Sequence, residues 1–406
     1  MPKTGTMAVN ISYMGTKKEL APVVGQVIRD CQSGILLDAF AGMCSVGEVV
    51  APRRQVWSND TQVFAAEVGR ALFTSTDEPP NVLRTADLHF EAFQRHRQDL
   101  EKCCPRSLEA ERNLLDSPNF RVFSRRRTIL SRALSLDLAR IQRGRYNLFS
   151  GTYSDSYFGL HQAIEVDAIV YAIRSSHMAG LVTIDQKRWL TIGLARALLK
   201  ISNSTGHFAQ FLKPKTSSYE RYLRQRRRNP WTDWLYSVGE LAATGTLDWR
   251  RKNKSFHQDS LLLLPKLLKL KTRPSVIYAD PPYTDDQYSR FYHLLDTLML
   301  YDFPKVSGAG LYRGERFQTP FSLKSKAVSA FDSLVSAAAR TGADFVLSYP
   351  SNGLIHEVGV DPGDLLRRYF RHVECCYSLP YSHSTFGASK GAARASVTEL
   401  VYRAKS

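Results

Sequence analysis

The sequence lacks the marks of a secreted, membrane-spanning or metal-binding protein. Its six cysteines, at positions 31, 44, 103, 104, 375 and 376, include no C-x-x-C pair, which favours neither a disulfide framework nor a zinc site. The ten histidines show no H-E-x-x-H or other ligand spacing. No apolar run approaches the roughly 20 residues of a membrane span, and the first residues do not have the pattern of a secretory signal. We therefore expect a cytoplasmic protein with reduced cysteines, no metal and no membrane partner.

Acidic residues are scarce relative to basic ones. Lysine and arginine total 55 against 38 aspartates and glutamates, which gives a formal net charge of +17. A field of this sign suits a polyanionic partner, most simply nucleic acid, although a basic surface that is merely solvated would have the same composition. The 406 residues exceed the roughly 100–200 of a usual single domain, so we expect a main domain with an insert or a second domain.

Strand and helix signals alternate near both ends of the chain. The expected elements are, in order, a helix over 17–29, a strand over 34–40, a helix over 45–50, strands over 55–60 and 275–279, a helix over 292–301, and strands over 343–349 and 397–402. This alternation predicts an α/β fold with a mostly parallel sheet. Ligands of such a fold bind at the carboxyl ends of its strands.

The middle of the chain has a different composition and predicts a largely helical insertion. Arginines crowd 121–145 and 221–228, close to aromatic residues. Clustered arginine interleaved with aromatic rings favours a DNA or RNA surface, with Arg226, Arg227 and Arg228 as phosphate contacts, whereas a solvated helix face is the alternative. The predicted division is a first core part over 1–90, an insertion over 91–254 and a second core part over 255–406.

A turn of small residues follows the first expected strand. Asp38-Ala-Phe-Ala-Gly42 can let the backbone approach a ligand closely. A P-loop is disfavoured because Gly47 is followed by Glu48 and Val49, and the G-x-G-x-x-G dinucleotide fingerprint is absent. The next strand ends in Asp60, which can accept hydrogen bonds from ribose hydroxyls. A purely structural turn between strand and helix is the alternative.

The most informative segment is Asp280-Pro281-Pro282-Tyr283, directly after the strand over 275–279. Two prolines cannot continue a central strand, because each lacks the N–H group and fixes φ. The chain therefore leaves the sheet at its carboxyl edge, where it offers a carboxylate, backbone carbonyl acceptors and the Tyr283 ring as a stacking surface. This set fits a planar base with an exocyclic amine, and a plain turn is the alternative.

Four motifs resemble, in order, those of the Dam-type adenine-specific DNA methyltransferases, which belong to the alpha group of that superfamily. They are Tyr13-Met-Gly-Thr-Lys17, Asp38-Ala-Phe-Ala-Gly42, Asn59-Asp60 and Asp280-Pro-Pro-Tyr283. The resemblance covers about 1–70 and 255–406. It implies a Rossmann-like fold with an inserted, largely helical target-recognition region. That insert is larger than in compact members, and Met43-Cys44 stands where many relatives have small residues.

The resemblance implies a site-specific DNA adenine-N6 methyltransferase, which transfers a methyl group from S-adenosyl-L-methionine to the exocyclic amine of a flipped adenine. The implied partner is double-stranded DNA, with or without a separately encoded restriction enzyme, in a prokaryote or phage. The implied catalytic residues are Asp280, Pro281, Pro282 and Tyr283. The implied cofactor residues are Tyr13, Gly15, Lys17, Asp38, Phe40, Gly42, Asp60 and Asp259, the last in the place of an aspartate that often precedes the catalytic strand. Tyr288 and Arg290 follow the catalytic turn and are further expected DNA contacts, unless they only begin a helix.

The chemistry of amine methylation agrees with these residues. An aromatic amine is a poor nucleophile because its lone pair is delocalised into the ring. Hydrogen bonds to Asp280 and to the Pro281 carbonyl would favour a pyramidal nitrogen and match the positive charge that develops on it. The same logic serves RNA adenine or the N4 amine of cytosine. A catalytically silent DNA-binding protein on this scaffold is the alternative from a different class.

Overall fold

A computed structural model describes residues 9, 17–138, 146–382 and 396–406 of the chain. These residues form two compact units, which we treat separately. Unit 1 takes its described residues from 1–77, 242–291 and 316–406, and unit 2 from 78–241 and 292–315. None of the described helices is long and apolar enough to cross a membrane. The functional division of the chain drawn from its sequence stays a prediction.

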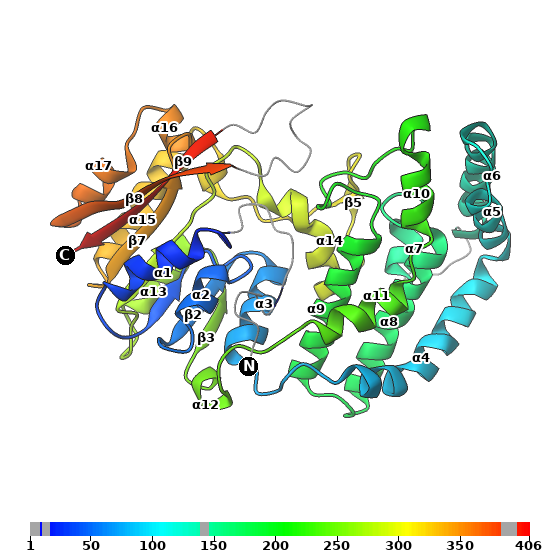
Figure 1. The fold of residues 1–406 in the computed structure, drawn as a ribbon, viewed down its shortest axis with the longest axis horizontal. Coiled ribbons are helices and arrows are strands. Elements are labelled where there is room, and N and C mark those ends of the chain that lie inside the picture. Colours follow the sequence, from blue (N-terminus) through cyan, green and yellow to red (C-terminus); the bar gives the residue numbers. More distant parts are fainter. Residues whose placement is uncertain (1–8, 10–16, 139–145, 383–395) are drawn as a thin grey trace. The chain divides into compact units, whose positions relative to one another are not determined.

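Unit 1 contains a seven-stranded sheet with the strand order β3-β2-β1-β4-β7-β9-β8 (Figure 1). The strands are β1 (Leu36–Asp38), β2 (Val56–Asp60), β3 (Lys254–His257), β4 (Val276–Ala279), β7 (Asp344–Pro350), β8 (His372–Ser382) and β9 (Ser396–Lys405). Neighbours from β3 to β7 pair in parallel, whereas β9 pairs antiparallel with both β7 and β8. The predicted α/β fold with a mostly parallel sheet is thus confirmed.

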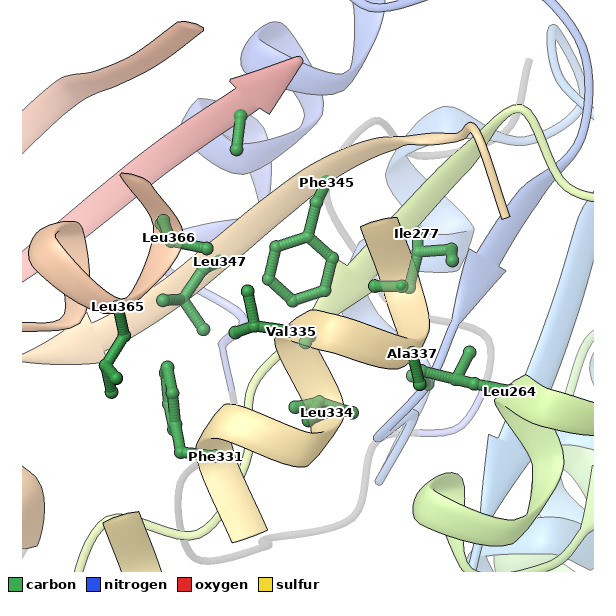
Figure 2. Packing of buried hydrophobic residues seen from close by; sticks show 14 of the residues in the cluster. Leu264, Ile277, Phe331, Leu334, Val335, Ala337, Phe345, Leu347, Leu365 and Leu366 are labelled. Carbon is green, nitrogen blue, oxygen red and sulfur yellow. The ribbon is translucent and has the colours of Figure 1, made fainter. Parts of the chain in front are cut away.

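One face of this sheet packs on the helices α13 (Ser260–Leu267) and α15 (Ala327–Ala339). Leu37 of β1 is in register with Ile277 of β4, which is in register with Phe345 of β7. Because side chains alternate along a strand, these three residues lie on the same face. They are buried in one cluster with Leu264 of α13 and Leu334 of α15. Figure 2 shows Ile277, Phe345, Leu264 and Leu334 in this cluster. Removal of this apolar surface from water is the main contribution that stabilises unit 1.

A close contact with α3 (Val63–Thr74) on the opposite face sets the position of α2 (Ser45–Val50). A Cβ atom at Gly47 of α2 would lie 2.6 Å from Cζ of Phe73 and 3.2 Å from Cγ1 of Val56. Phe73 belongs to α3 and Val56 to β2, and both are buried. Glycine at this position therefore lets α2 lie directly against α3 and the sheet, which fixes the turn that precedes α2.

The helices of unit 1 connect these strands. They are α1 (Ala21–Arg29), α2 (Ser45–Val50), α3 (Val63–Thr74), α12 (Leu247–Arg250), α13 (Ser260–Leu267), the 3-10 turn Pro320–Ser322, α15 (Ala327–Ala339), α16 (Leu354–Glu357) and α17 (Pro362–Arg367), while α14 (Tyr288–Leu300) runs from unit 1 into unit 2. The helix predicted over 17–29 begins only at Ala21, because a proline occupies its first turn. Lys17 lies before it and accepts the backbone N–H groups of Leu20 and Ala21 through its carbonyl.

Unit 2 is mainly helical in its described residues. Its elements are α4 (Val82–Cys103), α5 (Pro105–Leu115), α6 (Phe120–Leu138), α7 (Leu148–Thr152), α8 (Leu160–Met178), α9 (Ile184–Ile201), the 3-10 turn Thr216–Ser218, α10 (Tyr219–Arg226), α11 (Pro230–Gly239) and the strand pair β5 (Val306–Ser307) and β6 (Tyr312–Arg313). This confirms the expectation of a largely helical region in the middle of the chain.

A fully buried carboxylate links three elements of unit 2. Asp167 of α8 accepts the backbone N–H groups of Phe149 at 2.9 Å and Ser150 at 2.8 Å. It also accepts the hydroxyl of Ser150 at 2.7 Å and that of Tyr301 at 2.6 Å. Burial raises the pKa of Asp167 to about 7, although these hydrogen bonds lower it. Asp167 therefore satisfies donors that would otherwise be buried without a partner.

We expect Asp167→Ala to lower the free energy of unfolding by roughly 3–5 kcal/mol, because several buried donors lose their acceptor at once. Urea unfolding followed by circular dichroism measures this loss. The matched control is Asp99→Ala on α4, where a 59% exposed carboxylate pairs with Lys102. The control should change stability by no more than about 0.5 kcal/mol. Equal effects of the two substitutions would contradict the role given to Asp167.

Candidate active site

A pocket opens at the carboxyl ends of the central strands of unit 1. Asp38 ends β1, Asp60 ends β2, and Asp280 directly follows β4. All three line the pocket, which holds about 930 Å³ of space, including the part open to solvent. Its lining also includes Lys17, Phe40, Gly42, Gln62, Asp259, Pro282, Tyr283, Gln287, Tyr288, Thr319 and Phe321. This is the position in which an open α/β sheet binds its ligands.

The glycine turn is held in place by Asp60. Gly42 has a positive φ of 49°, and its N–H group donates to Oδ2 of Asp60 at 2.9 Å. The other carboxylate oxygen accepts the N–H group of Gln62 at 2.8 Å. Burial raises the pKa of Asp60, against the lowering effect of these hydrogen bonds. Asp60 thus fixes the backbone of the turn in addition to lining the pocket.

Asn59 links the ends of three strands. Its side-chain amide donates to the carbonyl of Ala39 at 3.1 Å and to that of Gln258 at 3.0 Å. Its side-chain oxygen accepts the N–H group of Gln258 at 3.2 Å. Because Asn59 is buried at the end of β2, it holds the chain after β1 and the chain after β3 in fixed positions beside the pocket.

The segment Asp280–Tyr283 leaves the sheet as the two prolines require. Tyr283 packs edge-to-face on Tyr349 with ring centroids 6.4 Å apart, and its carbonyl accepts the N–H group of Leu354 at 2.9 Å. The ammonium of Lys17 lies 5.4 Å from the centroid of the Tyr283 ring. The ring is therefore held by its neighbours at the wall of the pocket, where a planar ligand could stack.

Lys17 joins two carboxylates, those of the fully buried Glu399 and of Asp280, which is 13% exposed. Its Nζ atom lies 3.1 Å from Oδ1 of Asp280 and also donates to Oε1 of Glu399. The pKa of Asp280 is raised to about 7, mainly by burial. Lys17 acts to lower this pKa, and Glu399 acts to raise it. Burial alone would lower the pKa of Lys17, but Asp280 and Glu399 outweigh it and raise that pKa above its ordinary value. Lys17 therefore stays protonated.

Asp38 is an unusual carboxylic acid at the end of β1. Its pKa is raised to about 8. Burial is the largest cause, and the nearby carboxylates of Asp280 and Asp60 also contribute. Among the residues that the structure describes, Oδ1 of Asp38 has no hydrogen-bond partner. A cationic ligand in the pocket would supply the missing partner and favour the ionised form.

Other residues predicted for the site have definite positions. Asp259 lines the pocket and also caps α13 by accepting the N–H group of Leu261 at 2.9 Å. Phe40 lines the pocket and packs edge-to-face on Phe321, with centroids 5.5 Å apart. Tyr288 lines the same pocket. Its pKa is raised mainly by burial and also by the nearby Tyr283. Tyr13 and Gly15 lie outside the described residues, so their expected roles stay predictions.

The predicted arginines of α10 and the following turn do not form one exposed group. Arg226 is only 2% exposed; it donates to the carbonyl of Ser156 at 2.9 Å, and its guanidinium carbon lies 4.8 Å from the centroid of the Tyr222 ring. Arg226 is therefore a packing residue in unit 2, which corrects its prediction as a surface phosphate contact. Arg227 and Arg228 are exposed.

Two of the arginines predicted to contact DNA, the exposed Arg228 and the partly exposed Arg290, have acidic partners. Arg228 donates to both carboxylate oxygens of Asp233, at 3.0 and 2.6 Å. Arg290 pairs with Asp286 at 2.8 Å. Such exposed pairs contribute little to stability, so both guanidinium groups can exchange their partners for phosphate oxygens.

Some pocket residues were missed by the sequence analysis. Gln287 and Thr319 exchange two hydrogen bonds across the pocket wall, at 2.8 and 3.2 Å. Glu399 is fully buried in β9. The available signal for Glu399 was the single charged side chain in the strand over 397–402. The described residues contain no group of three or more metal-ligating side chains.

The sheet and the pocket at its strand ends define an α/β protein of the Rossmann-like methyltransferase class. Residues 251–342 match the family described as D12 class N6 adenine-specific DNA methyltransferase. This match and the similarity to bacterial modification methylases support the adenine-specific DNA methyltransferase family that the motifs predicted.

The chain is similar to several bacterial modification methylases. It is 24% identical over 324 residues to modification methylase LlaI of Lactococcus lactis subsp. lactis, which covers 79% of this chain and 43% of that protein. It is 23% identical over 350 residues to modification methylase StsI of Streptococcus sanguinis, with 85% and 44% covered. It is 22% identical over 353 residues to type II methyltransferase M.FokI of Planomicrobium okeanokoites, with 86% and 46% covered. The matched region thus spans less than half the length of these relatives.

Proposed function

We propose that this protein is a site-specific DNA adenine-N6 methyltransferase that uses S-adenosyl-L-methionine as methyl donor. The observation that carries the proposal is the convergence of Asp38, the Gly42 turn and Asp60 with Asp280 and Tyr283 around one pocket. The first three belong to the side expected to bind the cofactor, and the last two to the catalytic side. One pocket can therefore bring a methyl donor and an amine acceptor together.

The donor fits the chemistry of the pocket. S-adenosyl-L-methionine carries a positive sulfonium and an ammonium group and supplies an activated methyl group. Asp38 offers a buried carboxylate oxygen for which no hydrogen-bond partner lies among the described residues. Gly42 lets the backbone approach closely, and Asp60 retains lone pairs for ribose hydroxyls. Phe40 and Asp259 complete the proposed cofactor side, with Lys17 beside it. Tyr13 and Gly15 are proposed as further cofactor residues and lie outside the described residues.

The catalytic side would bind a flipped adenine. The target amine would donate to the Asp280 carboxylate and the Pro281 carbonyl, while the base stacks on Tyr283. These acceptors stabilise the positive charge that develops on nitrogen as the methyl group is transferred. Pro282 keeps the chain turned away from the sheet, so that the acceptors face the pocket. Tyr288 lies close enough to line the same space.

The proposed substrate is double-stranded DNA. The net charge of +17 suits a polyanion. The relatives are named modification methylases, so we propose a separately encoded restriction enzyme as the functional counterpart, with both proteins in the cytoplasm. RNA adenine and cytosine-N4 methylation use the same pocket chemistry and are outcomes of the test below.

Sequencing that detects modified bases, applied to DNA from cells that express the protein, tests this function. We expect N6-methyladenine at one recurrent sequence, absent from cells that express the Asp280→Ala variant. N4-methylcytosine at the recurrent site, methylation confined to RNA, or no modification with a folded protein would overturn the proposal in favour of one of its alternatives.

The substitution Asp60→Ala should weaken cofactor binding by about 1.5–3 kcal/mol, because a charged hydrogen-bond acceptor is lost. Asp60 would act in two ways. It would accept hydrogen bonds from the ribose, and its Oδ2 atom accepts the N–H group of Gly42 at 2.9 Å, which fixes the turn. Calorimetry with S-adenosyl-L-methionine measures the change. Asp248→Ala, which removes an 85% exposed carboxylate of unit 1, is the control and should bind as the unmodified protein does. Unchanged affinity in Asp60→Ala would show that the cofactor lies elsewhere.

The double substitution of Arg227 and Arg228 by alanine should weaken binding to all DNA duplexes. If each arginine contacts one phosphate, the slope of log affinity against log salt should become shallower by about 1.8. The preferred sequence should stay the same, because phosphate contacts carry no base information. Fluorescence binding at several salt concentrations measures the slope. Arg367→Ala on α17, 60% exposed and paired with Asp364, is the control. An unaltered slope in the double variant would remove both arginines from the DNA surface.

A further inference from the structure

Glu399 is a buried carboxylate in the antiparallel part of the sheet. It lies on β9 opposite Pro350 of β7 and has no exposed surface. An ionised side chain in such a strand is costly unless it has a partner. Its partner is the ammonium of Lys17, 382 residues away in the sequence. Packing alone gives no reason for a carboxylate at this place, because an apolar side chain would suit the strand.

The three groups Glu399, Lys17 and Asp280 form one buried cluster. Lys17 contributes one positive charge, and the two carboxylates contribute two negative charges when ionised. The cluster then carries a net charge of −1. Among the described residues, Oε2 of Glu399 has no hydrogen-bond partner. Lys17 therefore shares its charge between two carboxylates and neutralises neither of them fully.

We propose that Glu399 is a positioning residue: it holds the Lys17 ammonium between two carboxylates, so that Asp280 keeps an uncompensated negative charge for the target amine. This inference rests on the proposed function. In a cluster without the Glu399 charge, Lys17 and Asp280 would form a neutral pair. A neutral pair accepts a hydrogen bond less strongly than a free carboxylate does, and it stabilises less of the positive charge that develops on nitrogen.

Several other groups face Asp280 and would contribute to its titration. They are Lys17, Glu399, Tyr278, Asp38, Tyr288, Tyr283 and Tyr349. Of these, Lys17 favours the ionised form of Asp280, and Glu399 opposes it. Removal of the two charges should therefore shift the titration of Asp280 in opposite directions.

The test is Glu399→Gln, which keeps the shape of the side chain and an oxygen that can accept from Lys17. The titration of Asp280 is followed by NMR, as the ¹³C chemical shift of its carboxyl carbon against pH. The resonance is assigned by its absence in the Asp280→Asn variant. We expect Asp280 to titrate at a lower pH than in the unmodified protein. At a pH where Asp280 is ionised in both proteins, kcat should fall by about tenfold, the scale of one weakened charge-assisted hydrogen bond. The KM for the cofactor should stay within about twofold of the unmodified value, because kcat carries an effect confined to the transition state.

The matched control is Glu374→Gln on β8, where a 60% exposed carboxylate pairs with Arg403 on β9. It should leave both the titration of Asp280 and kcat unchanged. An unmoved titration in Glu399→Gln, or a moved titration with unchanged kcat, would overturn the proposal. If the unmodified protein itself transfers no methyl group, the proposed function fails instead, so the two failures are distinguishable.

A second variant tests the coupling without a change at Glu399. In Lys17→Met, the two carboxylates lose the cation between them. Asp280 should then titrate at a higher pH, because the cation that favours its ionised form is gone. This measurement needs no activity and applies even if Glu399→Gln fails to fold. Titration of Asp280 at the unmodified pH would overturn the proposal.

Discussion

Asp280→Ala is expected to lower methyl transfer by at least about 10²–10³-fold, while the affinity for S-adenosyl-L-methionine stays within a few-fold of the unmodified value. Asp280 lies directly after β4 and supplies the proposed acceptor for the target amine, whereas Asp38, Gly42 and Asp60 form the proposed cofactor side. Loss of one such transition-state contact typically lowers kcat by about 10²–10³-fold. Transfer of an isotope-labelled methyl group measures the rate, and calorimetry measures the affinity.

A change at an exposed carboxylate separates this effect from a general loss of charge. Asp248→Ala, which removes an 85% exposed side chain of α12 in the same unit, should retain full activity. Near-normal turnover in Asp280→Ala would show that the acceptor of the target amine is another group. Loss of both activity and cofactor affinity would show that Asp280 belongs to the cofactor side.

Cofactor affinity should rise with pH up to about 8 because of Asp38. The pKa of Asp38 is raised to about 8, mainly by burial and also by the carboxylates of Asp280 and Asp60. In the free protein, Asp38 is therefore mostly protonated below that pH. A cationic ligand binds the ionised form and must displace the proton. Affinity should therefore fall by about tenfold for each pH unit below 8 and become independent of this group above 8. Calorimetry in two buffers of different ionisation enthalpy should detect the release of nearly one proton near pH 7.

Asp38→Asn isolates this effect, because the amide cannot ionise. It should bind the cofactor weakly at pH 8 and should lack the proton release that is linked to Asp38. Any dependence on pH that remains would come from other carboxylates, above all Asp280. Identical pH profiles for Asp38→Asn and the unmodified protein would contradict the cofactor role of Asp38.

Sequence analysis predicted the central strands β4 and β7 from their mainly apolar residues. β4 and β7 are buried along their whole length and were recognisable for that reason. β3 was missed because it is a short edge strand, Lys254–His257, with two exposed ends and no apolar run. β8 was missed because it lies at the other edge of the sheet and has many partly exposed residues. Both edge strands, β3 and β8, are defined by pairing with the neighbouring strand, which the local sequence does not reveal.

The pocket could be predicted where chemistry follows a strand end along the chain. Asp38, Asp60 and Asp280 were identified in this way, and they line one pocket. The contact of Lys17 with Glu399 could not be predicted, because it joins the two ends of the chain through the order of the strands. Arg226 shows the converse limit: a run of arginines indicates charge, but only packing shows that the first of them is buried.

The central claim is most directly tested with purified protein, duplex DNA and S-adenosyl-L-methionine that carries a deuterated methyl group. After the reaction, the DNA is digested to nucleosides and analysed by mass spectrometry. We expect the label in N6-methyl-2′-deoxyadenosine. No label should appear in deoxycytidine, and no label should appear in DNA when the Asp280→Ala variant replaces the unmodified protein. Label in N4-methylcytosine, or no label in DNA from a folded protein that binds the cofactor, would contradict the assignment as a DNA adenine-N6 methyltransferase.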